Sequence, residues 1–185
     1  KGSSWRMLRT DVEVNPSLSA LRNGELQTAN GGRITFSLST ALRHWNFDQN
    51  SQIDVALNAN QVNADDLTKL AGRPVPIAGI LSANISVNGS ESSPLGKGKI
   101  GLAKARIAGE PVQSAELNFQ ASKDKMQANL RLQAPAGAIQ AAVTYSPKDQ
   151  RYEANVDAPG IQLDKLQTLL AKNIKVEGVL NVSAH

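Results

Sequence analysis

The chain has 185 residues, a net charge of +4 and no cysteine, so a disulfide framework and thiolate chemistry are excluded. Hydrophobic residues make up 41% of the sequence but aromatic residues only 4%, so we expect a core of Leu, Ile, Val and Ala. Lysines and arginines are scattered singly, whereas a nucleic-acid surface would concentrate them on one face. No nucleic-acid partner is therefore expected. No run of 18 apolar residues occurs, so any membrane anchor is expected outside this segment.

The first third of the chain is predicted to form half-buried strands, because apolar and polar residues alternate there. The alternating runs cover residues 5–15, 34–42 and 53–59. Between the first two runs, residues 18–21 suggest a helical turn and Asn23-Gly24 suggests a tight turn. Near residues 42–45 the apolar positions change from even to odd numbers. This change predicts either a bulge or the end of the strand.

A short helix and the clearest strand of the sequence follow. The helix is predicted over residues 65–71, with Asp65 as its N-terminal cap and Gly72 as its stop. Within residues 77–88, aliphatic residues and one glycine occupy one face, and Ser and Asn dominate the other. This alternation is typical of an antiparallel strand with one buried face.

The second half of the chain is predicted to form an antiparallel meander. Its alternating runs cover residues 100–107, 115–121, 126–132, 139–145 and 152–158. Short turn signals, such as Lys123-Asp124, Pro135–Gly137 and Ser146–Gln150, separate the later runs. Runs of similar length joined by short turns indicate successive hairpins.

Residues 62–87 share a pattern with residues 161–185, which lie 99 positions later. In both segments an acidic residue, Asp65 or Asp164, opens a short Leu-x-x-Leu turn that precedes a strand with an internal glycine. Such repetition is typical of units that stack on their neighbours to bury an apolar face. We therefore interpret the chain as one continuous segment of a longer protein. It comprises the end of one β-repeat (residues 1–61), a central repeat (62–160) and the start of the next (161–185).

The predicted strands carry Ser, Asn, Gln and Thr on one face and aliphatic residues on the other. No predicted helix is long enough to cover the aliphatic face, and a second sheet would normally bring Trp or Phe into the core. Only Phe36, Phe119 and Trp45 are available for that role. The predicted fold class is all-β: an elongated, strongly curved antiparallel sheet, a half-pipe or β-taco groove, built from meander repeats with short helical turns between them. A sandwich with an aliphatic core is the alternative.

The sequence offers no pattern that predicts an active site. Residues 96–101 match G-x-G-x-x-G, but no amphipathic helix follows, so a flexible hairpin end is preferred over a nucleotide-binding turn. His44 and His185 are too far apart for a metal site or a supported catalytic base. Asp65-Asp66 suits a helix N-terminus better than a catalytic carboxylate pair. We therefore expect no enzymatic activity, no metal and no cofactor.

Several short motifs occur together in the chain from about residue 54 to its end, and the last of them occurs twice. They are Gly-x-Ile-x-Leu-x-x-Ala-x-Ile at 98–107, Gly109-Glu110-Pro111-Val112, the Ala-x-Leu-Asn-Phe and Ala-x-Leu-Arg-Leu hairpins, and Asp-x-Leu-x-x-Leu followed by an x-Gly-x-Leu strand. In this combination the chain resembles the AsmA-like and TamB (translocation and assembly module) family of diderm bacteria, which are bridge-like lipid transfer repeat proteins.

The resemblance implies a long half-pipe in the periplasm, anchored in the inner membrane and reaching towards the outer membrane. It implies phospholipid transport that supports outer-membrane assembly, and an outer-membrane barrel partner of the TamA/BamA type. The anchoring helix and the partner-docking region are not recognisable in this segment, so contacts with both membranes are expected through parts outside it.

The resemblance and the alternation together predict a groove for phospholipid acyl chains, lined by aliphatic and aromatic residues. The predicted lining residues are Ile53, Val55, Leu57, Ile77, Leu81, Ile85, Val87, Leu117, Phe119, Leu130, Leu132, Ile139, Val143, Tyr145, Val156, Val176, Leu180 and Val182. The rival hypothesis is a structural or adhesive β-repeat whose aliphatic face is a closed core that binds no lipid.

Overall fold

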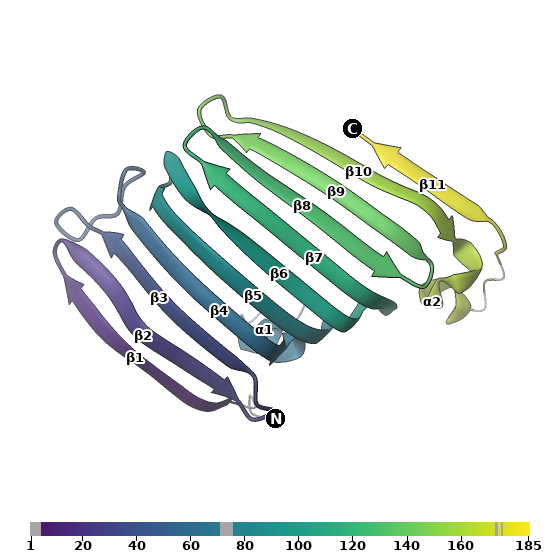
Figure 1. Ribbon diagram of the computed structural model, residues 1–185, viewed down its shortest axis with the longest axis horizontal. Helices are drawn as coiled ribbons and strands as arrows, with labels where there is room; N and C mark the ends of the chain where they lie inside the picture. Colours follow the sequence, from purple (N-terminus) through teal and green to yellow (C-terminus); the bar gives the residue numbers. More distant parts are fainter. Residues whose placement is uncertain (1–4, 71–75, 173, 175) are drawn as a thin grey trace.

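The computed structural model describes residues 5–70, 76–172, 174 and 176–185, and these form a single antiparallel β-sheet (Figure 1). The strands are β1 (Trp5–Asn15), β2 (Leu18–Thr28), β3 (Arg33–Ala41), β4 (Ile53–Asn63), β5 (Ile77–Ser90), β6 (Ser93–Ile107), β7 (Glu110–Ser122), β8 (Lys125–Ala134), β9 (Gly137–Ser146), β10 (Arg151–Gln162) and β11 (Val179–Ala184). All eleven lie side by side in sequence order, and the sheet is not closed. The predicted all-β class and antiparallel meander are confirmed.

Three short helical segments accompany the sheet: α1 (Ala64–Leu70), the 3-10 turn η1 (Leu163–Lys165) and α2 (Gln167–Leu170). Figure 1 shows α1 behind the sheet and α2 beside the lower ends of β10 and β11. None of the described helices combines the length and apolar character needed to cross a bilayer.

The register of the strands collects the alternating apolar residues into rows that cross the sheet. The central row runs through directly opposed residues, namely Leu26, Ile34, Ala59, Ala83, Ile100, Leu117, Leu130, Ala141 and Val156. The next row comprises Phe36, Leu57, Ile85, Gly98, Phe119, Ala128, Val143 and Ala154. We call the side of the sheet that carries these rows the apolar face. Successive side chains of a strand point to opposite faces, so the residues between the rows form the opposite, polar face.

Bulges in some strands keep the apolar residues on one face at the places where the alternation of apolar and polar residues in the sequence is interrupted. Between Ala59 and Val62 of β4 the chain has three steps, whereas the partner residues Ala83 and Leu81 of β5 are two steps apart. The extra residue adopts the left-handed conformation at Gln61, with φ of 50°. A bulge of this kind turns an odd and an even position towards the same side. An equivalent shift lies between Ala158 and Ile161 of β10, next to Gly160.

The best-buried part of the apolar face lies under α1. Ile34, Ala59, Val62 and Ala83 are buried there, and Leu67 of α1 packs against them. Val62 is fully buried. The helix therefore covers one end of β4 and β5, because it follows β4 directly and folds back onto the apolar face.

Several sequence predictions need correction. Residues 18–21 form the start of β2 and not a helical turn, and Asn23-Gly24 lies within β2 at a register shift. The G-x-G-x-x-G segment lies inside β6 and not at a hairpin end. Strand β3 ends at Ala41, so the change of apolar positions after it marks a strand end. Helix α1 begins at Ala64, which places Asp65 in its first turn and not at the cap. The predicted stop at Gly72 lies outside the described residues.

Two phenylalanines of the apolar face lie against a glycine of the neighbouring strand. Phe36 is opposite Gly24, and Phe119 is opposite Gly98. A methyl group added to either glycine would overlap the phenyl ring. An aromatic ring that covers a cross-strand glycine compensates for the missing side chain. The glycines are thus required by the rings and not by turns of the chain.

We expect Gly98→Ala to lower the free energy of unfolding by about 1–3 kcal/mol, the usual cost of overpacking, because its methyl group must displace the ring of Phe119. Combining Gly98→Ala with Phe119→Leu should recover part of this loss, since the two residues are coupled. Urea unfolding followed by circular dichroism measures both values.

Gly101→Ala is the matched control in the same strand. There the nearest atom to an added methyl group is 3.9 Å away, so the substitution should be neutral or slightly stabilising. Equal destabilisation by Gly98→Ala and Gly101→Ala would contradict this account of the glycine–phenylalanine pairs.

Candidate functional site

The apolar face is the main candidate for a functional surface, because large apolar side chains on it remain exposed. Leu8, Val12 and Tyr152 are 66%, 64% and 78% exposed. The side chains of Val143, Tyr145, Leu180 and Val182 are also exposed. In the described part of the chain, only the short segments α1, η1 and α2 accompany the sheet, and no second sheet is present. These exposed residues lie in β1 and in β9 to β11, towards the two edges of the sheet. Exposed apolar patches mark sites of interaction with another molecule.

The structure brings most of the predicted lining residues together. All of them except Val176 lie in strands, and Val176 lies in the segment before β11. Val55, Leu57, Ile85, Val87, Leu117, Phe119, Leu130, Val143, Tyr145 and Val156 occupy adjacent rows of the apolar face. A further row joins Leu81, Leu102, Ala115, Leu132 and Ile139. Ile53 is opposite Thr40, Ile77 is opposite Ile107, and Leu180 and Val182 pair with Ile161 and Ala158.

Sequence reasoning left several residues of these rows out of the predicted lining. Phe36 and Leu38 of β3, and Ile100 and Leu102 of β6, belong to the same rows. Their alternation was visible in the sequence. The signal that would have included them is cross-strand register, which alternation within one strand does not supply.

One end of the apolar face forms a pocket of about 440 Å³ beside η1 and α2. Its walls come from the β6–β7 hairpin, the β8–β9 hairpin, and strands β10 and β11. Glu110 and Lys165 are the only charged residues among those that line it, and the rest are apolar or glycine. Ligand pockets typically measure about 300–1,000 Å³ and are mostly apolar with a few placed polar groups. This pocket fits that description.

Glu110 connects the β6–β7 hairpin to α2. Its carboxylate accepts hydrogen bonds from the backbone N–H of Gln167 at 2.9 Å and of Thr168 at 2.7 Å, and also from the Thr168 hydroxyl. These backbone groups belong to the first turn of α2, where N–H groups have no partner within the helix. Three strands separate β7 from β11 in the sheet. The carboxylate therefore holds α2 across the ends of intervening strands.

The contact with α2 lowers the pKa of Glu110. Burial raises the pKa of Glu110, but the hydrogen bonds from Thr168 and Gln167 and the positive charge of Arg106 outweigh burial, so that the pKa lies below its usual range. Hydrogen bonds to the charged form of a carboxyl group favour that form. The charged carboxylate is thus the form that holds α2.

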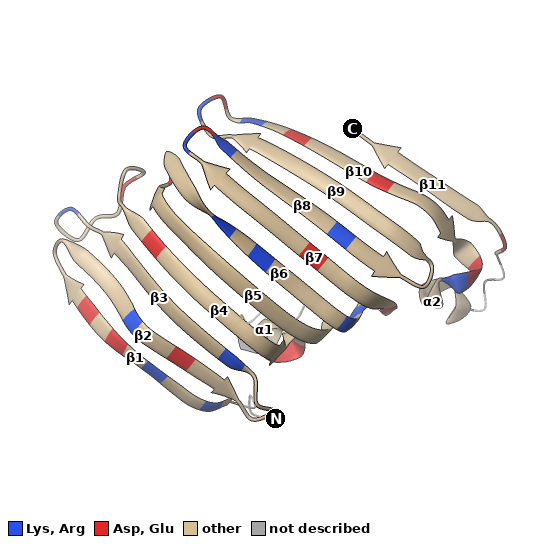
Figure 2. Cartoon of the chain, viewed as in Figure 1, with Lys and Arg blue, Asp and Glu red and all other residues tan. Residues whose placement is uncertain are grey.

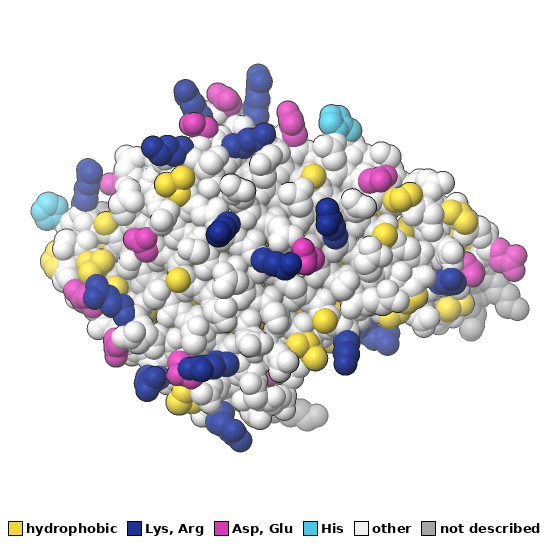
Figure 3. Space-filling model, viewed as in Figure 1, with side chains coloured by type: hydrophobic (Ala, Val, Ile, Leu, Met, Phe, Trp, Pro, Cys, Tyr) yellow, Lys and Arg dark blue, Asp and Glu magenta, His cyan; other side chains and the backbone are white. Residues whose placement is uncertain are grey.

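The polar face has a different character. Figure 2 shows charges of both signs spread over many strands, and Figure 3 shows this face as a largely uncharged polar surface with separate charged side chains. One of its rows contains Thr35, Asn58, Asn84, Lys99, Asn118 and Asn129. Lys99 contacts Glu116 at 2.7 Å. Charges of alternating sign that pair locally are typical of a solvated surface.

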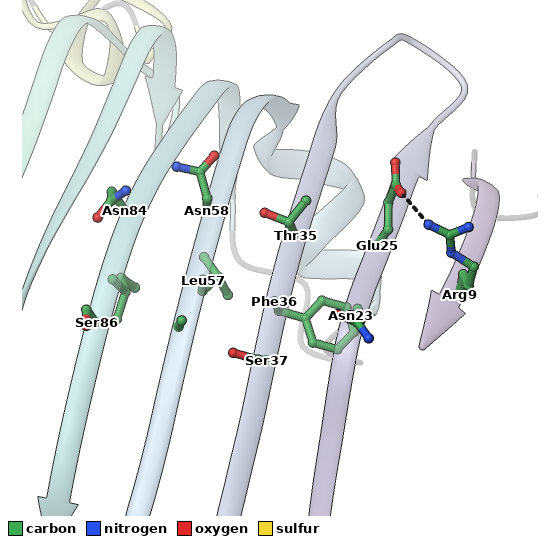
Figure 4. A pocket seen from close by; sticks show the side chains of 13 residues that line it. Arg9, Asn23, Glu25, Thr35, Phe36, Ser37, Leu57, Asn58, Asn84 and Ser86 are labelled. Atoms are coloured by element: carbon green, nitrogen blue, oxygen red, sulfur yellow. Dashed lines mark hydrogen bonds and ion pairs between the residues drawn. The ribbon is translucent and has the colours of Figure 1, made fainter. Parts of the chain in front are cut away.

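A shallow depression of about 520 Å³ lies over β1 to β5, lined by polar-face residues and by parts of Phe36, Leu57 and Ile85 (Figure 4). Glu25 is the one carboxylate among its described lining residues. It contacts Arg33 at 2.9 Å and Arg9 at 3.4 Å, and accepts a hydrogen bond from Gln27. The hydrogen bond from Gln27 lowers the pKa of Glu25, burial opposes it, and the nearby arginines lower it further. The negative charge of Glu25 is balanced by the two arginines, so the depression offers no unpaired carboxylate among its described residues.

The groups considered for chemistry from the sequence are separated in the structure. His44 lies in the turn after β3, and His185 contacts Asn155 at the other end of the sheet. The described residues contain no group of three or more His, Cys, Asp or Glu side chains placed to hold a metal ion. Asp65 and Asp66 lie in the first turn of α1, where negative charge is favourable.

Comparison with protein-family models, with curated proteins and with solved structures found no match.

We expect the contact between Glu110 and α2 to depend on pH. The pKa of Glu110 is lowered in the folded protein. The charged carboxylate therefore contributes its full stabilisation at a pH above the pKa of the unfolded state, which is about 4.3. This contribution is lost as the pH falls through the lower pKa of the folded state. In ¹⁵N NMR titrations, the amide shifts of Gln167 and Thr168 should therefore change below pH 4.3.

Glu110→Gln should abolish this titration and reduce the protection of the α2 amides from hydrogen exchange at pH 7. Thr168→Val is the matched control, because it removes only the hydroxyl donor and leaves both backbone bonds. It should keep the titration and raise its midpoint. Amide shifts that titrate identically in Glu110→Gln and in the unmodified protein would show that another group controls α2.

Proposed function

We propose that this chain is a segment of a lipid-transport bridge, whose apolar face shields phospholipid acyl chains from water. The observation that carries the proposal is the continuity of the apolar rows. Each strand from β3 to β10 contributes an apolar residue or a glycine to the two rows described above, with no charged residue in either. Exposed side chains in and beside these rows leave the surface accessible to a ligand.

The energetics favour sliding over tight binding. Each methylene that leaves water gains about 0.8 kcal/mol, so moving a whole acyl chain through water would cost on the order of 10 kcal/mol. A continuous aliphatic surface removes this cost at every position along the path. Because neighbouring rows are chemically alike, no position holds a chain much more strongly than the next. Headgroups would stay in solvent at the open side of the sheet.

We further propose that the sheet is one stretch of a longer, curved half-pipe built from repeats. Two junctions that lie 99 residues apart share their local geometry, which supports a repeating unit. In each, a register shift precedes a short helix, and the following glycine has a positive φ, 138° at Gly79 and 144° at Gly178. The docking of α2 onto Glu110 supports curvature towards the apolar face. Strands spaced by about 4.8 Å would give this segment a length of roughly 50 Å across the strands.

The resemblance to the AsmA-like and TamB family extends the proposal to a cellular setting. The segment would then belong to a periplasmic protein anchored in the inner membrane of a diderm bacterium. It would conduct phospholipid towards the outer membrane and support outer-membrane assembly. An outer-membrane barrel protein of the TamA/BamA type would be its partner, through a region outside this segment.

Co-purification provides the first test of the proposal. The segment would be exported to a bacterial periplasm, purified without detergent, and studied by native mass spectrometry and lipid extraction. We expect phospholipid in more than stoichiometric amount. A protease-resistant protein that carries no lipid would contradict the proposal and favour a structural or adhesive β-repeat with a sealed aliphatic face.

Charged substitutions in the rows should block lipid transfer. Leu130 lies in the central row between Leu117 and Ala141, so Leu130→Glu would place a carboxylate on the path of the acyl chains. We expect transfer of fluorescent phospholipid between vesicles to fall at least tenfold. Leu117→Arg should have the same effect.

Asn129→Glu is the matched control for Leu130→Glu. It introduces the same charge one residue away, in the polar row opposite Asn118 and Ala142. Transfer by Asn129→Glu should stay within twofold of the unmodified segment. If a folded Leu130→Glu variant transfers lipid as well as Asn129→Glu does, the apolar face is not the path.

A further inference from the structure

We propose that the pocket beside α2 is a discrete binding site for one acyl chain that ends in an anionic headgroup, a carboxylate or a phosphate, held at Lys165. The inference rests on the proposed lipid function and deepens it, because it assigns one specific binding site on an otherwise uniform apolar face. Three features of the structure carry it: the enclosure of the pocket, its lining and the state of its two charged residues.

The pocket is enclosed on several sides by segments far apart in the sequence. The β6–β7 hairpin contributes Ile107 and Val112, and strands β8 and β9 contribute Leu132 and Ile139. Leu166, which lies between η1 and α2, also lines the pocket. The N–H of Gln162 donates to the carbonyl of Ala136 at 2.7 Å, which fixes the end of β10 to the β8–β9 hairpin. Together with the contact of Glu110 to α2, this bond holds the helical segment beside the pocket.

The equivalent junction at α1 is filled by its own side chains. Val62, Ala64 and Asp66 are 0%, 3% and 5% exposed there. The residues 99 positions later, Ile161, Leu163 and Lys165, are half-buried or exposed, and Ile161 and Lys165 line the pocket. Side chains therefore fill the first junction, whereas the second junction, built from η1 and α2, leaves space.

The two charged residues of the pocket are in different states. Glu110 is occupied by the N–H groups and the hydroxyl of α2, so its charge is satisfied by the protein. Lys165 is exposed, and its ammonium group has no carboxylate within 4.0 Å among the described residues. A cation beside an otherwise apolar pocket complements an amphiphile with one apolar tail and one negative headgroup.

The volume limits the occupant to a single chain. At about 440 Å³ the pocket lies near the lower end of the range of ligand sites, about 300–1,000 Å³. The limited depth of the pocket predicts how the dissociation constant depends on the length of the acyl chain. Each methylene that enters it should tighten binding about fourfold, and methylenes that extend beyond it should add much less.

The experiment measures the dissociation constants of saturated fatty acids with 8 to 18 carbons by isothermal titration calorimetry, below their critical micelle concentrations. We expect a roughly fourfold gain per methylene that reaches a plateau within the series. Lys165→Gln should weaken the binding of a fatty acid at least fivefold and leave the binding of the alcohol of equal chain length unchanged. Lysophosphatidic acid and vesicles of phosphatidylglycerol distinguish a free single-chain ligand from one chain of a membrane lipid.

A filling variant and its control separate this site from the rest of the apolar face. Ala134 lines the pocket, and Ala138 in the neighbouring strand does not. Ala134→Leu should abolish the plateau of affinity against chain length and weaken fatty-acid binding at least tenfold. Ala138→Leu should leave the plateau and the affinity unchanged. Circular dichroism confirms that each variant is folded.

The outcomes separate this proposal from the proposed function. If fatty acids bind without a plateau and without dependence on Lys165 and Ala134, while Leu130→Glu still blocks transfer, the pocket is not a site and the transport path stands. If Leu130→Glu has no effect but the pocket variants do, the pocket binds a ligand in a protein that does not transport lipid. A dimer that Ala134→Leu disrupts, with no fatty-acid binding, would show that a second copy fills the pocket and would overturn the proposal.

Discussion

An antiparallel register that keeps the apolar residues of all eleven strands on one face is the constraint on which the rest of this structure depends. Pleated strands send alternate side chains to opposite faces, and a slip of one residue between two neighbours would exchange the faces of every strand beyond it. Here eleven strands keep their apolar residues opposite one another. The division into an apolar and a polar face, the rows, the pocket and the positions of the three helical segments all follow from this register.

The register is maintained by local irregularities as much as by regular pairing. Where the apolar spacing changes, as between Ala59 and Val62, an extra residue with positive φ restores the face. Such a conformation is unfavourable for a residue with a side chain, and Gln61 and Lys104 both adopt it. The cost is offset because the alternative places aliphatic side chains in water and polar ones against the core.

Alternation was enough to predict the meander and the strands other than β2, because each of them has one polar and one aliphatic side. The errors lie where local signals compete with pairing. Asn23-Gly24 has turn chemistry, but pairing with β1 and β3 keeps it inside β2. The pocket could not be predicted, because Ile107, Ile139 and Leu166 come together only through the folding of the β6–β7 hairpin, the β8–β9 hairpin and α2. The role of Glu110 was hidden for the same reason, since its partners lie 57 and 58 residues away.

Strand order that follows sequence order also determines how such a sheet can assemble. Each strand pairs with the one made just before it, so most connections that must close are short, and the entropic cost of the longer ones, over residues 64–76 and 163–178, grows only slowly with length. Predominantly local pairing favours fast folding for a β protein. The sheet can therefore lengthen strand by strand as the polypeptide is synthesised. The contact of Glu110 with α2 is an exception, because it can form only after β8, β9 and β10 are in place.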